Sequence, residues 1–319
     1  MARCRAEVSG LGAALAAEAL NGHQAAAFVA IECQWGRVVS LGMPEGHVIH
    51  RLAGKLDSVF TPEHTSESPL SEVSSPQGRF EAGARLVADL PYAGSEAHGK
   101  HLFIGFGPDR WIHVHLGLYG KFHVAEEPPG PVVGQVRLRM VGKSGHADLR
   151  GASACDLYGP DERTAMLRRL GPDPLRADAD PELAWRKISA SSLTIAELLM
   201  EQPVLSGVGN VYRAEVLFRA GLDPYRKGRD LTREQWDGMW DDLVVLMAEG
   251  ARIGRIDTVW PQHTPEAMGR PPRKDDHGGE VYVYRRNGQP CLVCGTPVAT
   301  AGVRDRNLFW CPTCQKAAA

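Results

Sequence analysis

Short apolar runs separated by Gly, Pro, Asn and Asp make up the chain from Met43 to about Tyr158. Polar and apolar residues alternate over 110–116 and 135–141, which is the period of a strand with one buried face. Many short strands at close spacing predict an antiparallel β-sandwich. One helix is predicted near 48–56, because its apolar residues fall on a single helical face.

Three further segments are interpreted from their composition. The apolar run 85–90 fits another short strand. The stretch 61–75 is rich in Ser, Glu and Pro and fits an exposed loop. The stretch 171–181 predicts a linker, because its prolines prevent a helix from continuing.

The apolar period becomes helical after this linker. Thr232 followed by Gln235 fits a capping box, and Gly221 stands where a glycine commonly ends a helix. Helices are therefore predicted over 182–190, 194–200, 210–220 and 232–250.

The composition is that of a soluble globular protein. Hydrophobic residues make up 43% of the chain and charged residues 23%, which excludes collagen-like, coiled-coil and wholly disordered classes. The 36 Lys and Arg against 38 Asp and Glu give a net charge of −2, so any surface that binds nucleic acid must be local. No apolar run approaches the roughly 20 residues of a membrane span, and a cytoplasmic, reducing compartment is predicted.

Cysteines are concentrated near the C-terminus, as Cys291-x2-Cys294 and Cys311-x2-Cys314. Two such pairs present four thiolates to one Zn²⁺ ion, with a hairpin between them. A redox dithiol uses a single pair, usually at a helix start, so structural zinc is the favoured interpretation. Four cysteines leave no open coordination position, which excludes the metal as the catalyst.

The segment between the cysteine pairs carries Arg304 and Arg306 beside the apolar and aromatic run 308–310. Basic and aromatic residues at a hairpin tip suit contact with phosphate. A solvated pair of charges is an equally open alternative.

A second candidate for phosphate binding is Gly207-Val-Gly209-Asn210, a tight turn followed by a new helix. The N–H groups at the start of a helix and its positive dipole end attract phosphate, and glycine allows a DNA backbone to approach closely. A plain helical hairpin stays open as the alternative.

Joined with the segment around Pro44, these motifs resemble the formamidopyrimidine-DNA glycosylase/endonuclease VIII family of base-excision-repair enzymes. The resemblance covers essentially all of 43–316, in the family's order, and its two ends look more like the endonuclease VIII branch. The motifs are Met43-Pro44-Glu45-Gly46, Gly99-Lys100-His-Leu-Phe, His115-Leu-Gly-Leu-Tyr-Gly, Gly207-Val-Gly-Asn210 and Arg306-Asn-Leu-Phe-Trp-Cys311-Pro-Thr-Cys314.

The resemblance implies an α+β fold. An N-terminal antiparallel β-sandwich with one helix would precede a C-terminal helix-two-turn-helix domain and a zinc-ribbon hairpin. The expected division is an extension over 1–42, a catalytic sandwich over 43–165, a DNA-binding helical domain over 178–281 and a zinc finger over 282–319.

The resemblance also implies a bifunctional glycosylase and AP lyase in which the amine of Pro44 attacks C1′ of the damaged nucleotide. A secondary amine forms a charged iminium ion that acts as an electron sink, and the strand is then cut on both sides of the sugar. Glu45 would be the acid and base that opens the ribose ring. Lys100 would contact phosphate and help to protonate the departing base.

The DNA contacts that the resemblance implies fall into two groups. The first group would bind the phosphates of a kinked duplex from which the damaged nucleotide is flipped out, and consists of Asn210, Arg306 and His115. His115 matches a position that contacts phosphate in the formamidopyrimidine branch. Leu118 and Tyr119 would fill the space that the flipped base leaves.

Two positions depart from the family pattern. Arg150 resembles the arginine that faces the orphaned base, but Ala152 stands where the formamidopyrimidine branch has an aromatic wedge. Val48 stands where a second acidic residue is common. The selectivity for the opposite base is therefore left open.

The predicted protein is a zinc-dependent, endonuclease VIII-like glycosylase and AP lyase that removes oxidised bases, pyrimidines before purines, from double-stranded DNA. We expect a monomer in the cytoplasm, associated with the nucleoid, with no organic cofactor and no membrane contact. An oxidised-purine enzyme and a DNA-binding protein without lyase chemistry stay open as alternatives. Pro44 can react only as a free amine, so the working protein is predicted to begin there, with Met43 as initiator and 1–42 outside the enzyme.

Overall fold

The structure is a computed structural model that describes residues 44–61, 70–274 and 279–316. These residues belong to one compact unit, Val39–Ala319. The predicted extension 1–42 and the predicted initiator Met43 lie outside the described residues. Within the part of the chain that the structure describes, no helix combines the length and apolar character needed to cross a membrane.

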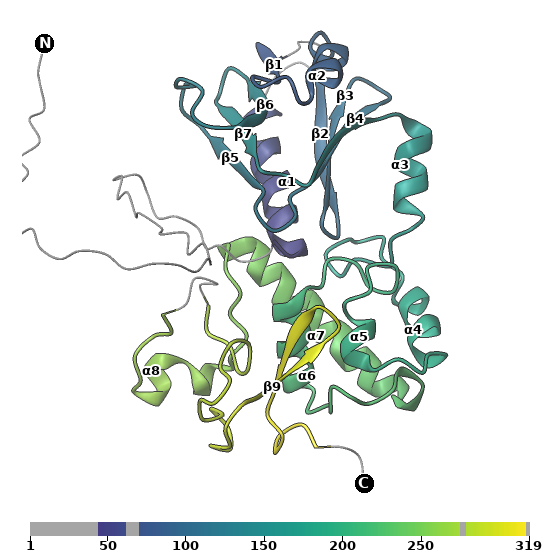
Figure 1. The fold of residues 1–319 in the computed structure, drawn as a ribbon, viewed down its shortest axis with the longest axis vertical. Helices are drawn as coiled ribbons and strands as arrows, with labels where there is room; N and C mark the ends of the chain where they lie inside the picture. Colours follow the sequence, from purple (N-terminus) through teal and green to yellow (C-terminus); the bar gives the residue numbers. More distant parts are fainter. Residues whose placement is uncertain (1–43, 62–69, 275–278, 317–319) are drawn as a thin grey trace, which may run out of the picture. The chain divides into compact units, whose positions relative to one another are not determined.

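The N-terminal region consists of two antiparallel sheets of four strands each (Figure 1). Their strand orders are β1-β6-β7-β5 and β2-β3-β4-β8. The first sheet holds β1 (Glu72–Ser74), β5 (Lys121–Ala125), β6 (Val136–Val141) and β7 (His146–Arg150), and the second holds β2 (Tyr92–His98), β3 (His101–Phe106), β4 (Arg110–His115) and β8 (Ala154–Tyr158).

Helix α1 (Gly46–Phe60) contacts β2 and β3 of one sheet and β5 of the other. The three elements share an apolar core, in which Ile112, Leu138 and Leu56 are fully buried. The predicted β-sandwich and its first helix are therefore confirmed. The helix is longer than the predicted 48–56, because buried apolar positions continue to its last turn.

Parts of this region differ from the prediction. The run 85–90, predicted as a strand, overlaps helix α2 (Glu81–Val87), in which Ala84 and Val87 are buried. The end of the predicted exposed loop is strand β1, which pairs with β6. Helix α3 (Pro160–Leu167) was not predicted, because none of its residues is buried and no apolar period marks it.

The C-terminal region is helical, as predicted, and its caps explain where the helices begin and end. Thr232 and Gln235 exchange the two hydrogen bonds of a capping box, and Gly221 follows the helix that begins at Asn210, with a φ of 64°. The helices are α4 (Pro181–Ser189), α5 (Ile195–Leu198), α6 (Asn210–Arg219), α7 (Arg233–Ile253) and α8 (Pro265–Met268), with short 3-10 turns at Gly228–Asp230 and Pro261–His263.

A two-stranded antiparallel hairpin follows the helices, formed by β9 (Ala299–Val303) and β10 (Arg306–Trp310) (Figure 1). Strand β10 contacts α6. The α+β class, with sheets first, helices next and a hairpin last, is confirmed.

The stretch 171–181, predicted as a linker, is packed into the structure. Asp173 is fully buried, and its carboxylate accepts hydrogen bonds from the N–H of Gly99 (2.7 Å), from His50 Nε2 (2.7 Å) and from the N–H of Leu175 (2.9 Å). Burial by itself raises the pKa of Asp173, but these hydrogen bonds, that of His50 first, hold it below its ordinary value. The segment therefore fixes the loop that carries Gly99 and Lys100.

Candidate active site

Three backbone segments that are distant in sequence meet at glycines. The N–H of Gly46 donates to the carbonyl oxygen of Gly207 at 2.8 Å, and a Cβ on Gly46 would stand 2.9 Å from Gly207 Cα. A Cβ on Gly99 would stand 2.8 Å from Gly207 N, and both of these glycines have positive φ, 60° and 88°. The N–H of Gly207 donates to Gln202 Oε1 at 3.0 Å. Because glycine has no Cβ, the backbones at the start of α1, in the loop before β3 and in the turn before α6 can pack directly against one another.

Glu45, the residue before α1, lies on the N-terminus of α6. Its carboxylate accepts the N–H groups of Gly209 (2.9 Å), Val211 (2.8 Å) and Tyr212 (3.4 Å), and the side chain is buried. A Cβ on Gly209 would stand 2.4 Å from Glu45 Cδ. A carboxylate of the protein thus accepts three of the N–H groups at this helix N-terminus. The DNA contacts predicted for Gly207, Gly209 and Asn210 stay predictions.

Glu45 and Lys100 interact as opposite charges in a setting shielded from water. Burial raises the pKa of Glu45, against the charge of Lys100 and the backbone hydrogen bonds. Burial also lowers the pKa of Lys100, against the attraction of Glu45 and together with repulsion from Arg306. Both shifts favour the neutral forms, a property common to groups that transfer protons.

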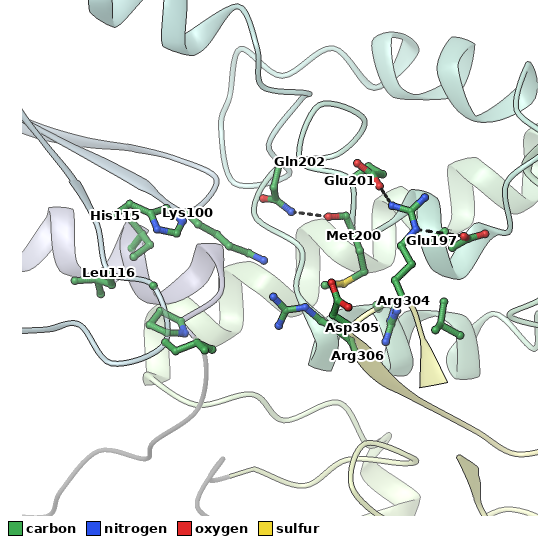
Figure 2. A pocket seen from close by; sticks show the side chains of 16 residues that line it. Lys100, His115, Leu116, Glu197, Met200, Glu201, Gln202, Arg304, Asp305 and Arg306 are labelled. Atoms are coloured by element: carbon green, nitrogen blue, oxygen red, sulfur yellow. Dashed lines mark hydrogen bonds and ion pairs between the residues drawn. The ribbon is translucent and has the colours of Figure 1, made fainter. Parts of the chain in front are cut away.

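A pocket of about 400 Å³ lies beside this junction (Figure 2). Figure 2 shows Lys100 and Arg306 pointing toward one another from the two sides of the pocket. The predicted site residues that line it are Pro44, Lys100, His115, Leu118, Arg304 and Arg306. Those that do not are Glu45, Tyr119, Arg150, Gly207, Gly209 and Asn210.

Arg213, which the sequence analysis missed, ties Asn210 to the hairpin. Its side chain is buried and lines the pocket, and Nη2 donates to Asn210 Oδ1 and, at 3.0 Å, to the carbonyl oxygen of Asn307. Asn210 Nδ2 donates to the same carbonyl oxygen at 3.0 Å. Burial lowers the pKa of Arg213 to about 10, so the guanidinium stays charged at neutral pH. Arg213 stands three residues after Asn210 and therefore on the same face of α6, and this spacing could have identified it from the sequence.

Arg304, predicted to contact phosphate, has protein partners in this structure. Its guanidinium donates to Glu197 Oε1 at 3.3 Å and pairs with Glu201 (Figure 2). Its backbone lies in the left-handed region, with a φ of 53°. The tip of the hairpin is therefore braced on α5 and on the turn that follows it.

Three histidines of β3 and β4 lie in contact with one another, and one of them, His115, lines the pocket. His101 Nδ1 and His113 Nε2 are 2.9 Å apart, and the ring centroids of His101 and His115 are 4.9 Å apart. Burial lowers the pKa of His101 to about 3 and that of His113 to about 4, so both are neutral at physiological pH. Of these three histidines, only His115 was predicted as a site residue, although the period of a strand places His113 on the same face.

Leu118 and Tyr119 stand in the turn between β4 and β5, with 55% and 77% of their surface exposed. Arg150, at the end of β7, donates to Asp148 Oδ2 at 3.0 Å. A Cβ on the next residue, Gly151, would stand 2.9 Å from the carbonyl oxygen of Tyr119. The structure thus brings Arg150 next to the exposed turn, and the roles predicted for these three residues stay predictions.

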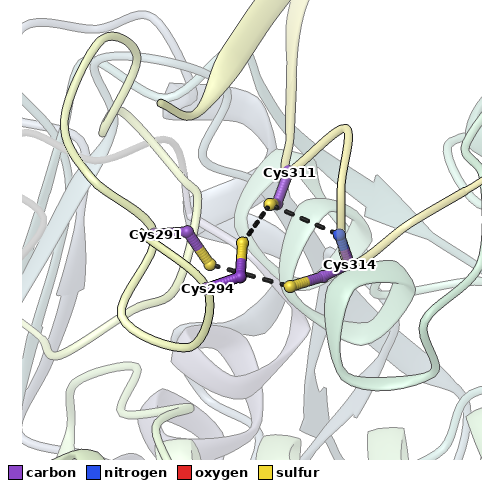
Figure 3. Close-up of side chains that lie close together, drawn as sticks. All are labelled: Cys291, Cys294, Cys311 and Cys314. Carbon is purple, nitrogen blue, oxygen red and sulfur yellow. Dashed lines mark hydrogen bonds between the residues drawn. The ribbon is translucent and has the colours of Figure 1, made fainter. Parts of the chain in front are cut away.

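The cysteines form one cluster (Figure 3). The four Sγ atoms all lie within 4.8 Å of one another, with Cys291 and Cys314 at 3.9 Å and Cys294 and Cys311 at 3.4 Å. A tetrahedral zinc ion with Zn–S bonds of about 2.3 Å requires Sγ atoms about 3.8 Å apart. The set fits one structural zinc ion, and the predicted cofactor is confirmed.

Comparison with known proteins finds three family models along the chain. The formamidopyrimidine-DNA glycosylase N-terminal domain matches residues 43–155, the formamidopyrimidine-DNA glycosylase H2TH domain matches residues 170–260, and the zinc finger found in FPG and IleRS matches residues 288–317.

Similar proteins carry two related names. Endonuclease 8 1 of Mycobacterium tuberculosis is 46% identical over 281 residues, which cover 86% of this chain and 100% of that protein. A formamidopyrimidine-DNA glycosylase of Parasynechococcus marenigrum is 33% identical over 227 residues, which cover 68% of this chain and 79% of that protein. A solved complex between the Lactococcus lactis Fpg and an abasic site containing DNA has a TM-score of 0.67 at 20% identity, and covers 86% of this chain and 100% of that one.

The chain therefore belongs to the formamidopyrimidine-DNA glycosylase/endonuclease 8 family. It is a DNA-repair enzyme of the class of DNA glycosylases with AP lyase activity, and it carries the zinc finger of that family. The likeness to the solved structure shows the shared fold. The family resemblance inferred from the sequence motifs is confirmed.

Proposed function

We propose that this protein removes oxidised bases from double-stranded DNA and cuts the strand there, with the amine of Pro44 as the nucleophile. The observation that carries the proposal is that Pro44, Lys100 and Arg306 line one pocket while Glu45, the residue after Pro44, is buried. The reaction needs a free amine, groups that transfer protons and cations that bind phosphate within one site.

The proposed reaction forms and breaks bonds at C1′ of the damaged nucleotide. The nitrogen of Pro44 bonds to C1′ as the glycosidic bond breaks, and the base leaves with a proton from Lys100. The nitrogen then loses its own proton to the carboxylate of Glu45, and Glu45 delivers a proton to O4′. The C1′–O4′ bond breaks, so the ring opens and an iminium ion forms between the nitrogen and C1′. The iminium ion acidifies the hydrogens on C2′, and successive eliminations expel the 3′ and then the 5′ phosphate.

The assignment of proton transfer to Glu45 and Lys100 is supported by their settings. Glu45 is next to Pro44 in the chain, and its carboxyl group is fixed by hydrogen bonds to the start of α6. A raised pKa lets Glu45 hold the proton that O4′ needs. A lowered pKa lets Lys100 release a proton to the departing base.

Double-stranded damaged DNA is the proposed partner, with Arg306 and His115 on its phosphates. Arg213 and Asn210 would act indirectly, by holding the start of β10 through the carbonyl oxygen of Asn307. The exposed Leu118 and Tyr119 suit the filling of the space left by a flipped base, because apolar side chains replace lost base stacking.

Oxidised pyrimidines are the proposed lesions. The relative at 46% identity is an endonuclease 8, and Ala152 supplies no aromatic wedge beside Arg150. Single-turnover cleavage of duplexes that carry thymine glycol or 8-oxoguanine compares the two classes directly. Faster removal of 8-oxoguanine would replace this assignment with the oxidised-purine alternative.

Borohydride reduction in the presence of damaged duplex tests the nucleophile, because only an enzyme that forms an imine is trapped covalently. The chain that begins at Pro44 should be trapped. The chain that begins at Met1, verified as intact by mass spectrometry, should bind zinc but should not be trapped, because the nitrogen of Pro44 is then an amide. If the intact longer chain is trapped equally well, Pro44 is not the nucleophile, and a lysine such as Lys100 takes its place.

A further inference from the structure

The hydroxyl group of Ser153 makes two hydrogen bonds to one residue. Ser153 Oγ donates to the carbonyl oxygen of His115 at 2.9 Å and lies 2.8 Å from Nδ1 of the same histidine. A carbonyl oxygen can only accept, and a serine hydroxyl has one hydrogen to give. The ring nitrogen Nδ1 must therefore supply the hydrogen of the second contact.

This arrangement sets the tautomer of His115. When the ring is neutral, the proton is on Nδ1, and Nε2 keeps a lone pair. His115 lines the pocket, and Nε2 has no hydrogen-bond partner among residues 44–61, 70–274 and 279–316. Phosphate oxygens at neutral pH are acceptors, so a phosphate can bond to Nε2 only when His115 has gained a second proton.

The charged and titratable groups around His115 keep its ring neutral before DNA arrives. Burial lowers the pKa of His115, and the charge of Lys100, in the loop before β3, lowers it further. His101 on β3 and His113 on β4 are themselves neutral at physiological pH, and Asp156 on β8 acts on His113. In the free protein, the proton that a phosphate requires is therefore absent.

We infer that Ser153 is a positioning residue that couples DNA binding to proton uptake, because it holds neutral His115 in the form that cannot donate to a phosphate. The inference rests on the proposed function, since it takes a DNA phosphate as the ligand of His115. The phosphate brings an acceptor, solvent supplies one proton to Nε2, and the imidazolium then donates to the phosphate from Nε2 and to Ser153 from Nδ1.

The direction of the pH dependence follows from this exchange. Phosphate binds the protonated ring, so affinity is highest at pH values below the pKa of His115 in the free protein. Between that pKa and the higher pKa in the complex, the dissociation constant rises about tenfold for each pH unit, as for any binding that takes up one proton. Without Ser153 the neutral ring can place its proton on Nε2 and donate directly, so this part of the pH dependence disappears.

Calorimetry on a duplex that contains a tetrahydrofuran abasic analogue measures the coupling. Titrations at pH 7.5 in two buffers of different ionisation enthalpy give the number of protons taken up. The native enzyme should take up about one proton more than Ser153→Ala, as expected for a single linked group. Ser153→Thr, which keeps the hydroxyl group, should restore the native value. Contributions of the Pro44 amine, Glu45 and Lys100 are common to all three proteins and cancel in the comparison.

Nitrogen NMR of the imidazole rings in the DNA-free protein reads the tautomer directly. A proton on Nδ1 of His115 supports the inference, and a proton on Nε2 overturns it. Equal proton uptake by the native enzyme and Ser153→Ala also overturns it. The NMR measurement tests the tautomer of His115 in the absence of DNA, and borohydride trapping tests the nucleophile whatever that tautomer is. The two experiments therefore distinguish failure of this inference from failure of the proposed function.

Discussion

Replacing Asp173 with alanine should lower the free energy of unfolding of the protein, although the residue lies outside the helices and strands. Its carboxylate is fully buried and holds the N–H of Gly99, His50 and the N–H of Leu175. A buried donor without a partner costs about 1–3 kcal/mol, and the N–H of Gly99 would lose its partner completely. His50 and Leu175 are partly exposed and can regain water, so we expect the free energy of unfolding to fall by about 3 kcal/mol.

Asp178 provides a matched control in the same segment. It is also an aspartate with side-chain hydrogen bonds, in this case to Arg176 at 2.8 Å, but its side chain is 69% exposed. Exposed ion pairs contribute about 0–1 kcal/mol, so Asp178→Ala should be nearly neutral. Urea denaturation of both zinc-loaded variants, with m-values equal to that of the native protein, measures the difference. A loss for Asp173→Ala no greater than that for Asp178→Ala would refute the reasoning.

The same residue predicts how stability changes in acid. The pKa of Asp173 is lower in the folded protein than the value of about 3.9 expected in the unfolded chain. The contribution of Asp173 to the free energy of unfolding is therefore complete at pH values above its pKa in the unfolded chain. It is lost as the pH falls through its pKa in the folded protein. Asp173→Asn, which has no carboxylate to protonate, should lack this part of the acid loss. An identical decline of the native protein and Asp173→Asn between pH values of about 4 and 2 would contradict the assignment.

The other predictions concern the metal and the hairpin. Cys311→Ser should lose the zinc that metal analysis finds in the native chain, about one ion, and should lose DNA binding because the strand that carries Arg306 is no longer fixed; full binding without zinc would argue against this. Arg306→Ala should lower the slope of log affinity against log salt by about one unit on damaged and undamaged duplexes alike. Arg304→Ala should leave that slope almost unchanged, because Arg304 is paired with Glu197 and Glu201; a drop equal to that of Arg306→Ala would show that it turns to DNA.

The fold could be predicted where one physical pattern dominates. Alternation over 110–116 and 135–141 predicted strands β4 and β6, because their alternate apolar residues, such as Ile112 and Leu138, are fully buried in the core between the sheets. The run 85–90 could not be assigned in this way. Short apolar runs bury equally well as a strand or as a helix, and the packing of Ala84 and Val87 against neighbours distant in sequence decides for α2.

The site could be predicted only where single residues belong to a motif. Pro44, Lys100 and Arg306 stand in such motifs, and they line one pocket. The contacts that hold the site leave no local pattern. Asp173 reaches Gly99 across 74 positions, and Arg213 reaches Asn307 across 94, so neither bond has a period or a spacing that a sequence displays.

The start of α6 binds an anion, as the sequence predicts, but the anion in the structure is a side chain of the protein. A helix N-terminus after a glycine turn attracts an anion, and the anion present is the carboxylate of Glu45, the residue before α1. This substitution matters for the chemistry. The acid next to the proposed nucleophile is positioned by the helical region, and Gly46 is bonded to Gly207 in the same place. The proposed reacting groups Pro44, Glu45 and Lys100 all belong to the N-terminal region, but the contacts that position Glu45 come from the helical region. We therefore expect the N-terminal region by itself to lack a formed site.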